Sequence, residues 1–504
     1  MRQIDDSLNS ITMYKTVLYG LIILVIYAFL LSFMGSVGFS PVFMLLSLIT
    51  LAVTCFTLNF LLSSLFKIPA NSESYLITAL ILFFLFNPPA NSLSDLIPLF
   101  LSSFFAISSK YVLNIKKKHL FNPAAISAVA MSLIGFGASW WVATPVMLPA
   151  VFIVGLLIIR KIRKFSLFFT FSIVVVIEMI FFGFTYNLLP QKILAQLLLS
   201  WPFMFFASIM LTEPLTMPPT RKLQMLYGTL VGFLFAFQLP LGPIFFTPEL
   251  ALIAGNIFSY LVGSKQRVML ALERVDKLSS TIYNYRFRPS EKLKFNAGQY
   301  AEWTLPHKNP DSRGNRRYFT IASSPTEDEI MLGVRISDDG SSFKKALLNL
   351  RVHDKISLGS LAGDFTLPED SNEKLVFLAG GIGITPFRSI LKYLIDKNEK
   401  RNIVLFHSCS RGNDFVYDDV IKIAEKKIGL QMHCILSDEN DAPKDFKGEL
   451  GYLTAHLLKT LVTDYKERVF YISGSNVMVD ASKKTLKEAG IEKSNIRTDY
   501  FSGY

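Results

Sequence analysis

Long apolar runs fill the first half of the sequence and constrain its fold more than any other feature. Before Lys265, charged residues are rare, and apolar stretches long enough for a membrane helix recur along the chain. A helix that crosses the hydrocarbon core of a bilayer needs about 20 predominantly apolar residues. After Lys265, charges become frequent and the apolar runs shorten to the length of β-strands. The pattern predicts a membrane domain over residues 1–265, a linker over 266–276 and a water-soluble half.

The connecting loops of the apolar half predict its orientation. We place about ten spanning helices, centred near residues 25, 53, 81, 102, 130, 151, 175, 202, 231 and 255. Lysine and arginine gather in alternate loops, and Lys192 breaks this alternation. Because positively charged loops stay in the cytoplasm, we predict an integral protein of a bacterial plasma membrane, with both termini and the soluble half cytoplasmic. The net charge of +12 follows from the same bias, so we do not predict nucleic-acid binding.

Cysteine and histidine are too scarce for several kinds of electron carrier. The three cysteines, Cys55, Cys409 and Cys434, lie far apart in the sequence, which excludes a local disulfide framework or a CxxC metal site. An iron–sulfur cluster held by this chain alone is not expected, because such clusters need about four thiolates. Only His119 precedes residue 300, so the membrane half lacks the paired axial histidines of a b haem. Flavin or quinone must therefore carry any electrons across this half, and we predict no metal site.

Three stretches of the apolar half exceed what lipid solubility requires: 110–125, 139–149 and 205–222. The last two break apolar runs with proline and hydroxyl residues, and irregular backbone at membrane depth is tolerated where it lines a cavity or a cofactor. The motifs "HLFNPAA" and "LTEPLTMPPTRK" resemble the D subunit of the Rnf electron-transport complex and the B subunit of the Na⁺-pumping NADH:quinone reductase, a likeness that spans most of residues 10–262.

This resemblance implies a flavin within a ten-helix bundle. Some members attach FMN to a threonine in an Asp-x-x-Ser-Gly-Ala-Thr sequence, and the nearest match here is "SWWVAT", which ends at Thr144 but lacks the aspartate and the Ser-Gly pair. Structural explanations compete: Asn122-Pro123 can simply start a helix, Glu213-Pro214 can end one, and Trp140 and Trp141 can form an interfacial aromatic belt. Glu178, inside an apolar run, is either a functional group or a partner in an interhelical hydrogen bond.

The soluble half shows two successive patterns. Residues 277–369 form short alternating strands separated by turn residues, which predicts a small antiparallel barrel. Residues 370–504 alternate apolar strands with helical segments, which predicts a parallel, doubly wound α/β sheet. The predicted fold class is thus a transmembrane helical bundle followed by a β-barrel and an α/β domain.

Several motifs of this half resemble the ferredoxin–NADP reductase superfamily, over about residues 275–504. "RRYFTIASSP" is similar to its flavin signature. The resemblance implies that Arg317 binds the FAD pyrophosphate, that Phe319 stacks on the isoalloxazine, and that Thr320 lies near the flavin N5. "DGSSFKKAL" is similar to the second flavin phosphate site, with Gly340, Ser341 and Ser342 at a helix start.

The glycine-rich stretch "AGGIGITPF" resembles the dinucleotide site of the same superfamily. After a strand and before a helix, its backbone amides suit the pyrophosphate of NAD(P)H. The implied site consists of Gly380, Gly381, Gly383 and Thr385, with Thr385 facing the nicotinamide. "YISGSNVMV" resembles the nicotinamide edge and contributes Ser473, in place of a cysteine, and Gly474, so we expect slower hydride transfer.

Three further residues belong to the predicted cofactor sites. Phe501 and then Tyr504 are the C-terminal candidates for stacking on the flavin. Arg411 can meet a 2′-phosphate, which would favour NADPH, or can be a solvated loop residue, so the choice between NADH and NADPH stays open.

We therefore predict a membrane-bound NAD(P)H-oxidising flavoprotein. NAD(P)H gives a hydride to FAD, and single electrons then pass through the membrane domain, with FMN or another flavin as a possible carrier, to a quinone or an extracytoplasmic acceptor. The alternatives are a plain flavin or ferric reductase anchored in the lipid bilayer by cofactor-free helices, and a redox-driven ion pump. The sequence leaves the oligomeric state and partner subunits open.

Overall fold

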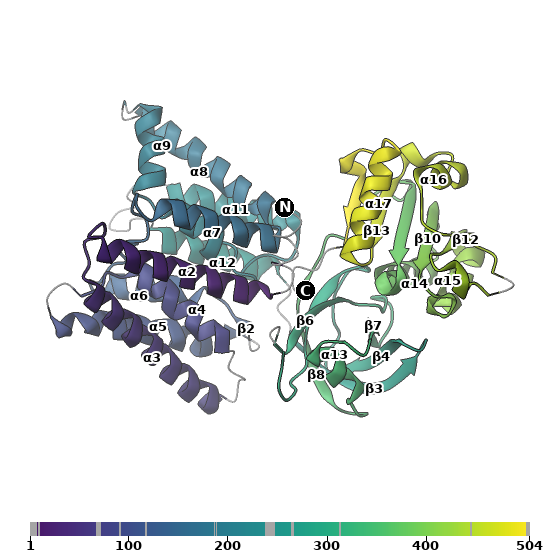
Figure 1. The fold of residues 1–504 in the computed structure, drawn as a ribbon, viewed down its shortest axis with the longest axis horizontal. Coiled ribbons are helices and arrows are strands. Elements are labelled where there is room, and N and C mark those ends of the chain that lie inside the picture. Colours follow the sequence, from purple (N-terminus) through teal and green to yellow (C-terminus); the bar gives the residue numbers. More distant parts are fainter. Residues whose placement is uncertain are drawn as a thin grey trace. The chain divides into compact units, whose positions relative to one another are not determined.

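The computed structural model describes residues 8, 11–66, 72–89, 92–115, 118–185, 187, 189–236, 247–263, 267–311, 314–443 and 446–499. The chain divides into two compact units between Lys265 and Gln266, where the composition of the sequence changes. Unit 1 is helical, and unit 2 contains the two large sheets (Figure 1).

Unit 1 is a bundle of helices that are apolar on most of their faces. Its main helices are α2 (Met13–Phe33), α3 (Pro41–Phe66), α4 (Ser72–Leu85), α5 (Ile97–Val112), α6 (Pro123–Leu133), α7 (Leu148–Ile162), α8 (Phe165–Thr185), α9 (Pro190–Leu199), α11 (Arg221–Ala236) and α12 (Pro248–Val262). The short α10 (Phe203–Phe205) continues into a π-helical turn, η2 (Phe206–Met210).

Within the described residues, three helices are long and apolar enough to cross a membrane, namely α2, α3 and α8. The bent pair formed by Pro190–Leu199 and Phe203–Met210, with an angle of 62° between its parts, adds a fourth if it counts as one span. Helices cover the predicted centres except the one near residue 202, which falls at this bend. Ten full-length spans are therefore not confirmed.

Proline and asparagine explain why several of these helices are short. α6 has 11 residues and begins at Pro123, directly after the N-cap Asn122, whose side chain accepts a hydrogen bond from the amide of Ala125. Proline is favoured at the first helical position because its missing N–H has no intrahelical partner there. Asn122-Pro123 thus starts a helix in the interior of unit 1. This confirms the structural explanation that the pair begins a helix.

The first sheet of unit 2 is antiparallel and strongly curled. It comprises β3 (Val268–Lys277), β4 (Ile282–Pro289), β5 (Tyr300–Thr304), β6 (Arg316–Thr320), β7 (Ile330–Arg335) and β8 (Lys355–Ala362), in the order β6-β5-β8-β3-β4-β7. The outer strands β6 and β7 approach each other. Just beyond β6, the amide of Ala322 donates to the carbonyl of Met331 in β7 at 2.9 Å. The short helix α13 (Ser342–Leu348) follows β7.

The predicted linker differs from the structure. Residues 268–277 form the strand β3, which pairs with both β4 and β8. Val268, Leu270 and Leu272 alternate with more exposed residues and are buried in the core of the curled sheet. This period of two is the signal of a half-buried strand. Met269 and Ala271 between these residues are also apolar, and the charges that follow from Glu273 onward conceal the alternation in the sequence.

The second sheet of unit 2 is parallel, as predicted. Its strands are β9 (Leu375–Gly380), β10 (Ile403–Cys409), β11 (Gln431–Leu436), β12 (Glu449–Leu450), β13 (Val469–Ser473) and β14 (Ile496–Thr498), in the order β12-β11-β10-β9-β13-β14. α14 (Thr385–Lys397) and α15 (Asp418–Ile428) pack on one face. α16 (Ala455–Leu461) and α17 (Asn476–Glu488) pack on the other, which makes the sheet doubly wound (Figure 1).

Candidate functional site

The glycine-rich turn joins β9 to α14 and leaves no room for side chains. Gly381 has a φ of +52°, a conformation that favours glycine. A Cβ on Gly383 would collide with the carbonyl oxygen of Ser473, and a Cβ on Gly380 would lie 3.0 Å from Cγ of Met478. The glycines therefore allow the backbone to turn tightly over the end of β13 and into α14, whose N-terminus is the kind of place that binds an anion.

The other residues predicted for the dinucleotide lie around this turn. Ser473 ends β13 and is buried, and a Cβ on Gly474 would lie 3.2 Å from the Cα of Gly380. Thr385 begins α14, is 6% exposed, and donates its hydroxyl to the carbonyl of Ile382 at 3.2 Å. The structure therefore brings the predicted residues of β9, α14 and β13 together at the carboxyl ends of the central strands, where ligands bind in open α/β sheets.

A cation that sequence reasoning missed borders the same turn. Arg335, the last residue of β7, has a terminal nitrogen 3.3 Å from the position that a Cβ on Gly381 would occupy. Its guanidinium pairs with the buried carboxylate of Asp414 at 2.7 Å, and that carboxylate also accepts from the hydroxyl of Ser279 at 3.1 Å. The sequence signal that could have pointed to Arg335 is a charged residue at the end of the otherwise apolar strand β7.

Arg317 and the start of α13 converge on one carboxylate. Arg317 is 3% exposed, and its guanidinium donates to Asp311 at 2.9 Å. The other oxygen of Asp311 accepts from the amide of Ser342 at 3.0 Å, while the amide of Asp311 donates to the Ser342 hydroxyl at 2.8 Å. A carboxylate of the chain thus occupies the place between the two groups that the sequence assigned to flavin phosphates.

The neighbouring predicted residues have local roles in this structure. Ser341 caps α13 by accepting from the amide of Lys344, and Gly340 lies in the turn before it. The Ser342 hydroxyl also lies 3.0 Å from Nε2 of His307. The donor set around Asp311, a guanidinium and a main-chain amide, is of the kind that binds phosphate.

Phe319 differs from its predicted role. It faces the interior of the curled sheet, is 7% exposed, and packs against Phe343 with ring centroids 5.8 Å apart. Because side chains alternate along a strand, Tyr318 and Thr320 face the opposite side. Tyr318 lies edge-on to Tyr300 at 5.9 Å. The aromatic residues available on the outer face of β5 and β6 are therefore Tyr300 and Tyr318, and the assignment of the stacking residue to Phe319 is not supported by its placement.

Asp499 links the two predicted cofactor sides. Its carboxylate accepts from the Thr320 hydroxyl at 3.2 Å, and its amide donates to the carbonyl of Ile472, the residue before Ser473, at 3.0 Å. Burial raises the pKa of the Asp499 carboxyl to about 7, and the hydrogen bond from Thr320 acts in the opposite direction. Sequence reasoning missed Asp499, which directly precedes the aromatic C-terminal residues.

The remaining predicted residues of unit 2 are less informative. Arg411 is exposed, and the amide of the next residue, Gly412, donates to the carboxylate of Asp441 at 2.8 Å. The loop therefore carries both a cation and an acid, and the choice between NADH and NADPH stays open. Phe501 and Tyr504 lie outside the described residues.

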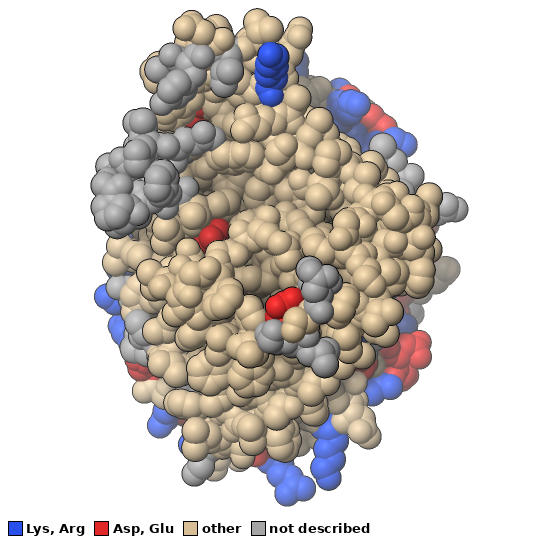
Figure 2. All heavy atoms as spheres, turned by 90° about the vertical axis from the view of Figure 1, so that its left-hand side faces the viewer, with Lys and Arg blue, Asp and Glu red and all other residues tan. Residues whose placement is uncertain are grey.

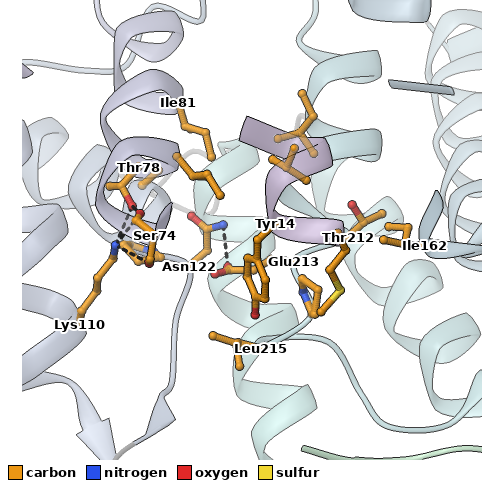
Figure 3. A pocket seen from close by; sticks show the side chains of 17 residues that line it. Tyr14, Ser74, Thr78, Ile81, Lys110, Asn122, Ile162, Thr212, Glu213 and Leu215 are labelled. Carbon is orange, nitrogen blue, oxygen red and sulfur yellow. Dashed lines mark hydrogen bonds between the residues drawn. The ribbon is translucent and has the colours of Figure 1, made fainter. Parts of the chain in front are cut away.

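In unit 1, the two motifs quoted above meet in one polar cluster. Nδ2 of Asn122 donates to Oε2 of Glu213 at 2.9 Å, and the amide of Asn122 donates to Oδ1 of Asn256 at 2.8 Å. Lys110 donates to the hydroxyls of Ser74 and Thr78 at 3.0 and 2.8 Å. Figure 3 shows both groups of contacts at the wall of a single cavity, so Glu213 does more than end a helix.

The stretch before Thr144 is folded into the bundle. Trp140 and Trp141 are 7% and 5% exposed, so the interpretation of an interfacial aromatic belt is wrong. The indole of Trp141 donates to the carbonyl of Phe83 at 2.6 Å, and that of Trp140 lies 3.3 Å from the carboxylate of Glu249. The hydroxyl of Thr144 is buried and has no hydrogen-bond partner among the described residues.

Comparisons with known proteins support the assignment of unit 2. Residues 377–484 match the oxidoreductase NAD-binding domain family. The chain is 25% identical over 209 residues to the glycine betaine monooxygenase reductase subunit of Chromohalobacter salexigens, which covers 41% of this chain and 56% of that protein. It is also 25% identical over 245 residues to a flavohemoprotein of Bacillus subtilis, with 47% and 60% covered. The chain thus spans less than two thirds of these relatives.

Among solved structures, the chain is similar to an Amycolatopsis cytochrome P450 reductase, with 24% identity and a TM-score of 0.41, over 46% of this chain and 69% of that one. The family match confirms the predicted NAD(P)-dependent oxidoreductase domain of the C-terminal half. The resemblance of the N-terminal half to the Rnf and quinone-reductase subunits stays a prediction.

Proposed function

We propose that the chain is a membrane-bound NAD(P)H-oxidising flavoprotein, in which unit 2 takes reducing equivalents from NAD(P)H and unit 1 passes electrons to a quinone or an extracytoplasmic acceptor. The observation that carries this proposal is the bridge made by Asp499. It ties Thr320, on the predicted flavin side, to the end of β13, on the nicotinamide side. Two cofactors bound at these places would lie next to each other.

The donor sets of unit 2 suit FAD and NAD(P)H. Arg317 and the amide of Ser342 would hold a flavin phosphate where the Asp311 carboxylate now lies, and Tyr300 and Tyr318 would border the isoalloxazine. Bound FAD supplies two-electron chemistry toward NAD(P)H and one-electron chemistry toward an acceptor. The chain itself contributes the glycine turn without side chains, Arg335 beside it, and a hydroxyl at Thr320 that donates to Asp499.

Unit 1 is suited to a lipid environment. Large apolar side chains are exposed along its longest helices, for example Ile26 at 56%, Phe60 at 66% and Phe181 at 68%. Figure 2 shows a broad face made almost entirely of uncharged residues, with lysine and arginine mostly at its edges. The exposed large apolar side chains along these helices need a cover, and a bilayer supplies it. We propose that both termini and unit 2 are cytoplasmic, as the loop charges indicate.

We propose that unit 1 passes electrons to its acceptor at the cavity lined by Lys110, Asn122 and Glu213. Ionisable groups inside a membrane domain are costly and usually functional. If it exchanges one of its contacts with Ser74 and Thr78, Lys110 can donate a hydrogen bond to a carbonyl oxygen of a quinone and a proton to that oxygen when the quinone is reduced. In the ion-pump alternative, Glu213 is better placed than Glu178, which does not line this cavity.

A second flavin near Thr144 is a further part of the proposal. Its support is the buried hydroxyl without a partner among the described residues, in a non-helical segment enclosed by aromatic residues. A linkage to FMN through this oxygen would satisfy it. Denaturing gel electrophoresis under ultraviolet light tests the covalent form: we expect a fluorescent band that disappears in Thr144→Ala. A dark band in the wild type contradicts covalent attachment.

Counting flavin per chain tests the whole proposal. Purified full-length protein should release FAD on denaturation and should be bleached by NAD(P)H. One FAD and no second flavin would favour the alternative of a flavin or ferric reductase with cofactor-free helices, or direct transfer from FAD to a quinone. A colourless, well-folded protein without affinity for FAD would remove the proposed function altogether.

A further inference from the structure

His407 lies on β10 beside the glycine-rich turn. Its backbone is in register with Ala379 of β9, and its side chain is completely buried. Nε2 lies 3.0 Å from the carbonyl oxygen of Gly381, the residue with a φ of +52°. The ring of Phe415 stands edge-on to the imidazole at 5.2 Å and fixes its orientation.

The contact determines where the proton of His407 is. A carbonyl oxygen accepts hydrogen bonds and cannot donate them, so Nε2 carries the proton. Burial lowers the pKa of His407 to about 4, so the imidazole is neutral near pH 7 and Nδ1 carries no proton. Nδ1 is buried and has no hydrogen-bond partner among the described residues. Nε2 also lies 3.4 Å from Sγ of Cys409 on the same strand, so the bond to Gly381 is the polar contact that this side chain makes with the turn.

Holding the Gly381 carbonyl also fixes the amide on the other side of the same peptide. In a planar trans peptide, the C=O and the N–H point in opposite directions. The Gly381 carbonyl points toward His407, inside the sheet, so the N–H of Ile382 points away from the sheet interior. The guanidinium of Arg335 borders the same glycine, with a terminal nitrogen 3.3 Å from the place that a Cβ there would occupy. A fixed amide thus lies beside a guanidinium that Asp414 holds in place at 2.7 Å, and both border the place of an anion here.

We propose that His407 is a positioning residue for the dinucleotide: its Nε2–H holds the Gly381 carbonyl and so keeps the Ile382 amide directed at the pyrophosphate of NAD(P)H. This inference rests on the proposed function of the glycine turn. Without the donor, the peptide between Gly381 and Ile382 can turn over and present a carbonyl oxygen to the phosphates, which repels them. His407 itself does not touch the dinucleotide.

Binding measurements on the full-length, FAD-loaded protein test the proposal. In His407→Phe, which lacks the donor, the Kd for NAD⁺ and for ADP-ribose should rise by about tenfold to a hundredfold, the loss expected for one amide to a charged phosphate. ADP-ribose keeps the pyrophosphate but lacks nicotinamide, so an equal loss for both places the effect at the phosphates. The KM for NAD(P)H should rise while kcat at saturation changes little.

Three further variants separate positioning from general stability. His407→Asn restores an N–H donor and should recover most of the affinity. His433→Phe changes a half-buried histidine on the adjacent strand β11, stacked on Phe406 at 5.0 Å, and should leave the Kd unchanged. If His407→Phe loses its FAD, His407→Leu, which also lacks a donor, replaces it.

Two results would overturn the inference. The first is an unchanged Kd for ADP-ribose in a donor-less variant that retains FAD. The second is an equal loss in His407→Asn and His407→Phe, which would mean that only the packing of the ring matters. A wild-type protein that binds neither NAD⁺ nor ADP-ribose would instead remove the proposed function, and this inference with it.

Discussion

Asp499 accepts a hydrogen bond from Thr320 at 3.2 Å across 179 residues of sequence, and both side chains are buried. The two residues belong to different sheets of unit 2, since Thr320 ends β6 and Asp499 follows β14. Burial raises the pKa of the Asp499 carboxyl to about 7, so this group gains or loses its own proton near neutral pH while Thr320 keeps its hydroxyl proton.

The first prediction concerns stability. The unfolded pKa of an aspartate is about 3.9, and burial raises the folded value to about 7. The folded state therefore holds one more proton between these values, so its stabilising contribution is complete below about pH 4 and is lost as the pH rises through 7. Asp499→Asn should unfold at a higher temperature than the wild type at pH 8 and at a similar temperature at about pH 4. Parallel pH profiles of thermal unfolding would contradict the raised pKa.

The same pair predicts a pH-dependent hydride-transfer rate. An ionised Asp499 accepts the hydrogen bond that the Thr320 hydroxyl donates. A protonated carboxyl leaves the Thr320 hydroxyl free to donate toward the flavin side. Stopped-flow bleaching by NAD(P)H should therefore slow as the pH rises through about 7, and Asp499→Asn should abolish this step. A step that persists in the variant must come from another group.

Asp311 should compete with the flavin phosphate. Its carboxylate lies between Arg317 and the amide of Ser342, so Asp311→Asn removes a negative charge that bound FAD must displace. We expect the FAD affinity of the apoprotein to rise by about tenfold, the effect of one charged hydrogen bond. Titration of apoprotein by FAD fluorescence measures this, with the exposed Asp338→Asn as the control. An unchanged affinity would show that FAD phosphates bind elsewhere.

Arg335 should matter for NAD(P)H binding. The Arg335→Ala variant loses the cation beside Gly381, so the KM for NAD(P)H should rise by about tenfold while FAD content stays normal. Arg288, whose side chain is 77% exposed, provides the matched control Arg288→Ala. Comparing NADH and NADPH in both variants and in Arg411→Ala also resolves the cofactor preference. Equal steady-state constants for Arg335→Ala and the wild type would remove Arg335 from the site.

Glu213 should be needed for electron delivery but not for NAD(P)H oxidation. Glu213→Gln removes the charge that faces Asn122 and Thr216, so quinone reduction in membranes should fall at least about tenfold. Ferricyanide reduction, which can draw electrons directly from unit 2, should remain. Glu178→Gln is the control, because Glu178 does not line the cavity. Loss of both activities would indicate misfolding, and loss of neither would exclude the cavity from the path.

Several features of the site were open to sequence reasoning because they depend on local chemistry. The glycine turn is an example: Gly381 needs its positive φ and Gly383 its missing Cβ wherever a strand enters a helix so tightly. The strand β3 was missed because Glu273, Arg274 and Asp276 mask its period of two. The lengths of several helices of unit 1 were overestimated. Hydropathy measures the length of an apolar run and does not register where proline and asparagine interrupt the helical backbone.

The sequence by itself determined the division into an apolar and a polar half, the two sheet patterns and the glycine turn, since each depends on composition or on neighbours within a few residues. The tertiary structure alone decided that Phe319 faces inward, that Asp311 lies between Arg317 and Ser342, and that Asp499 reaches Thr320. It also brought Asn122 to Glu213, across 91 residues. The physical reason is that the face of a strand and the meeting of distant polar groups depend on which elements pack together, and no local pattern records that packing.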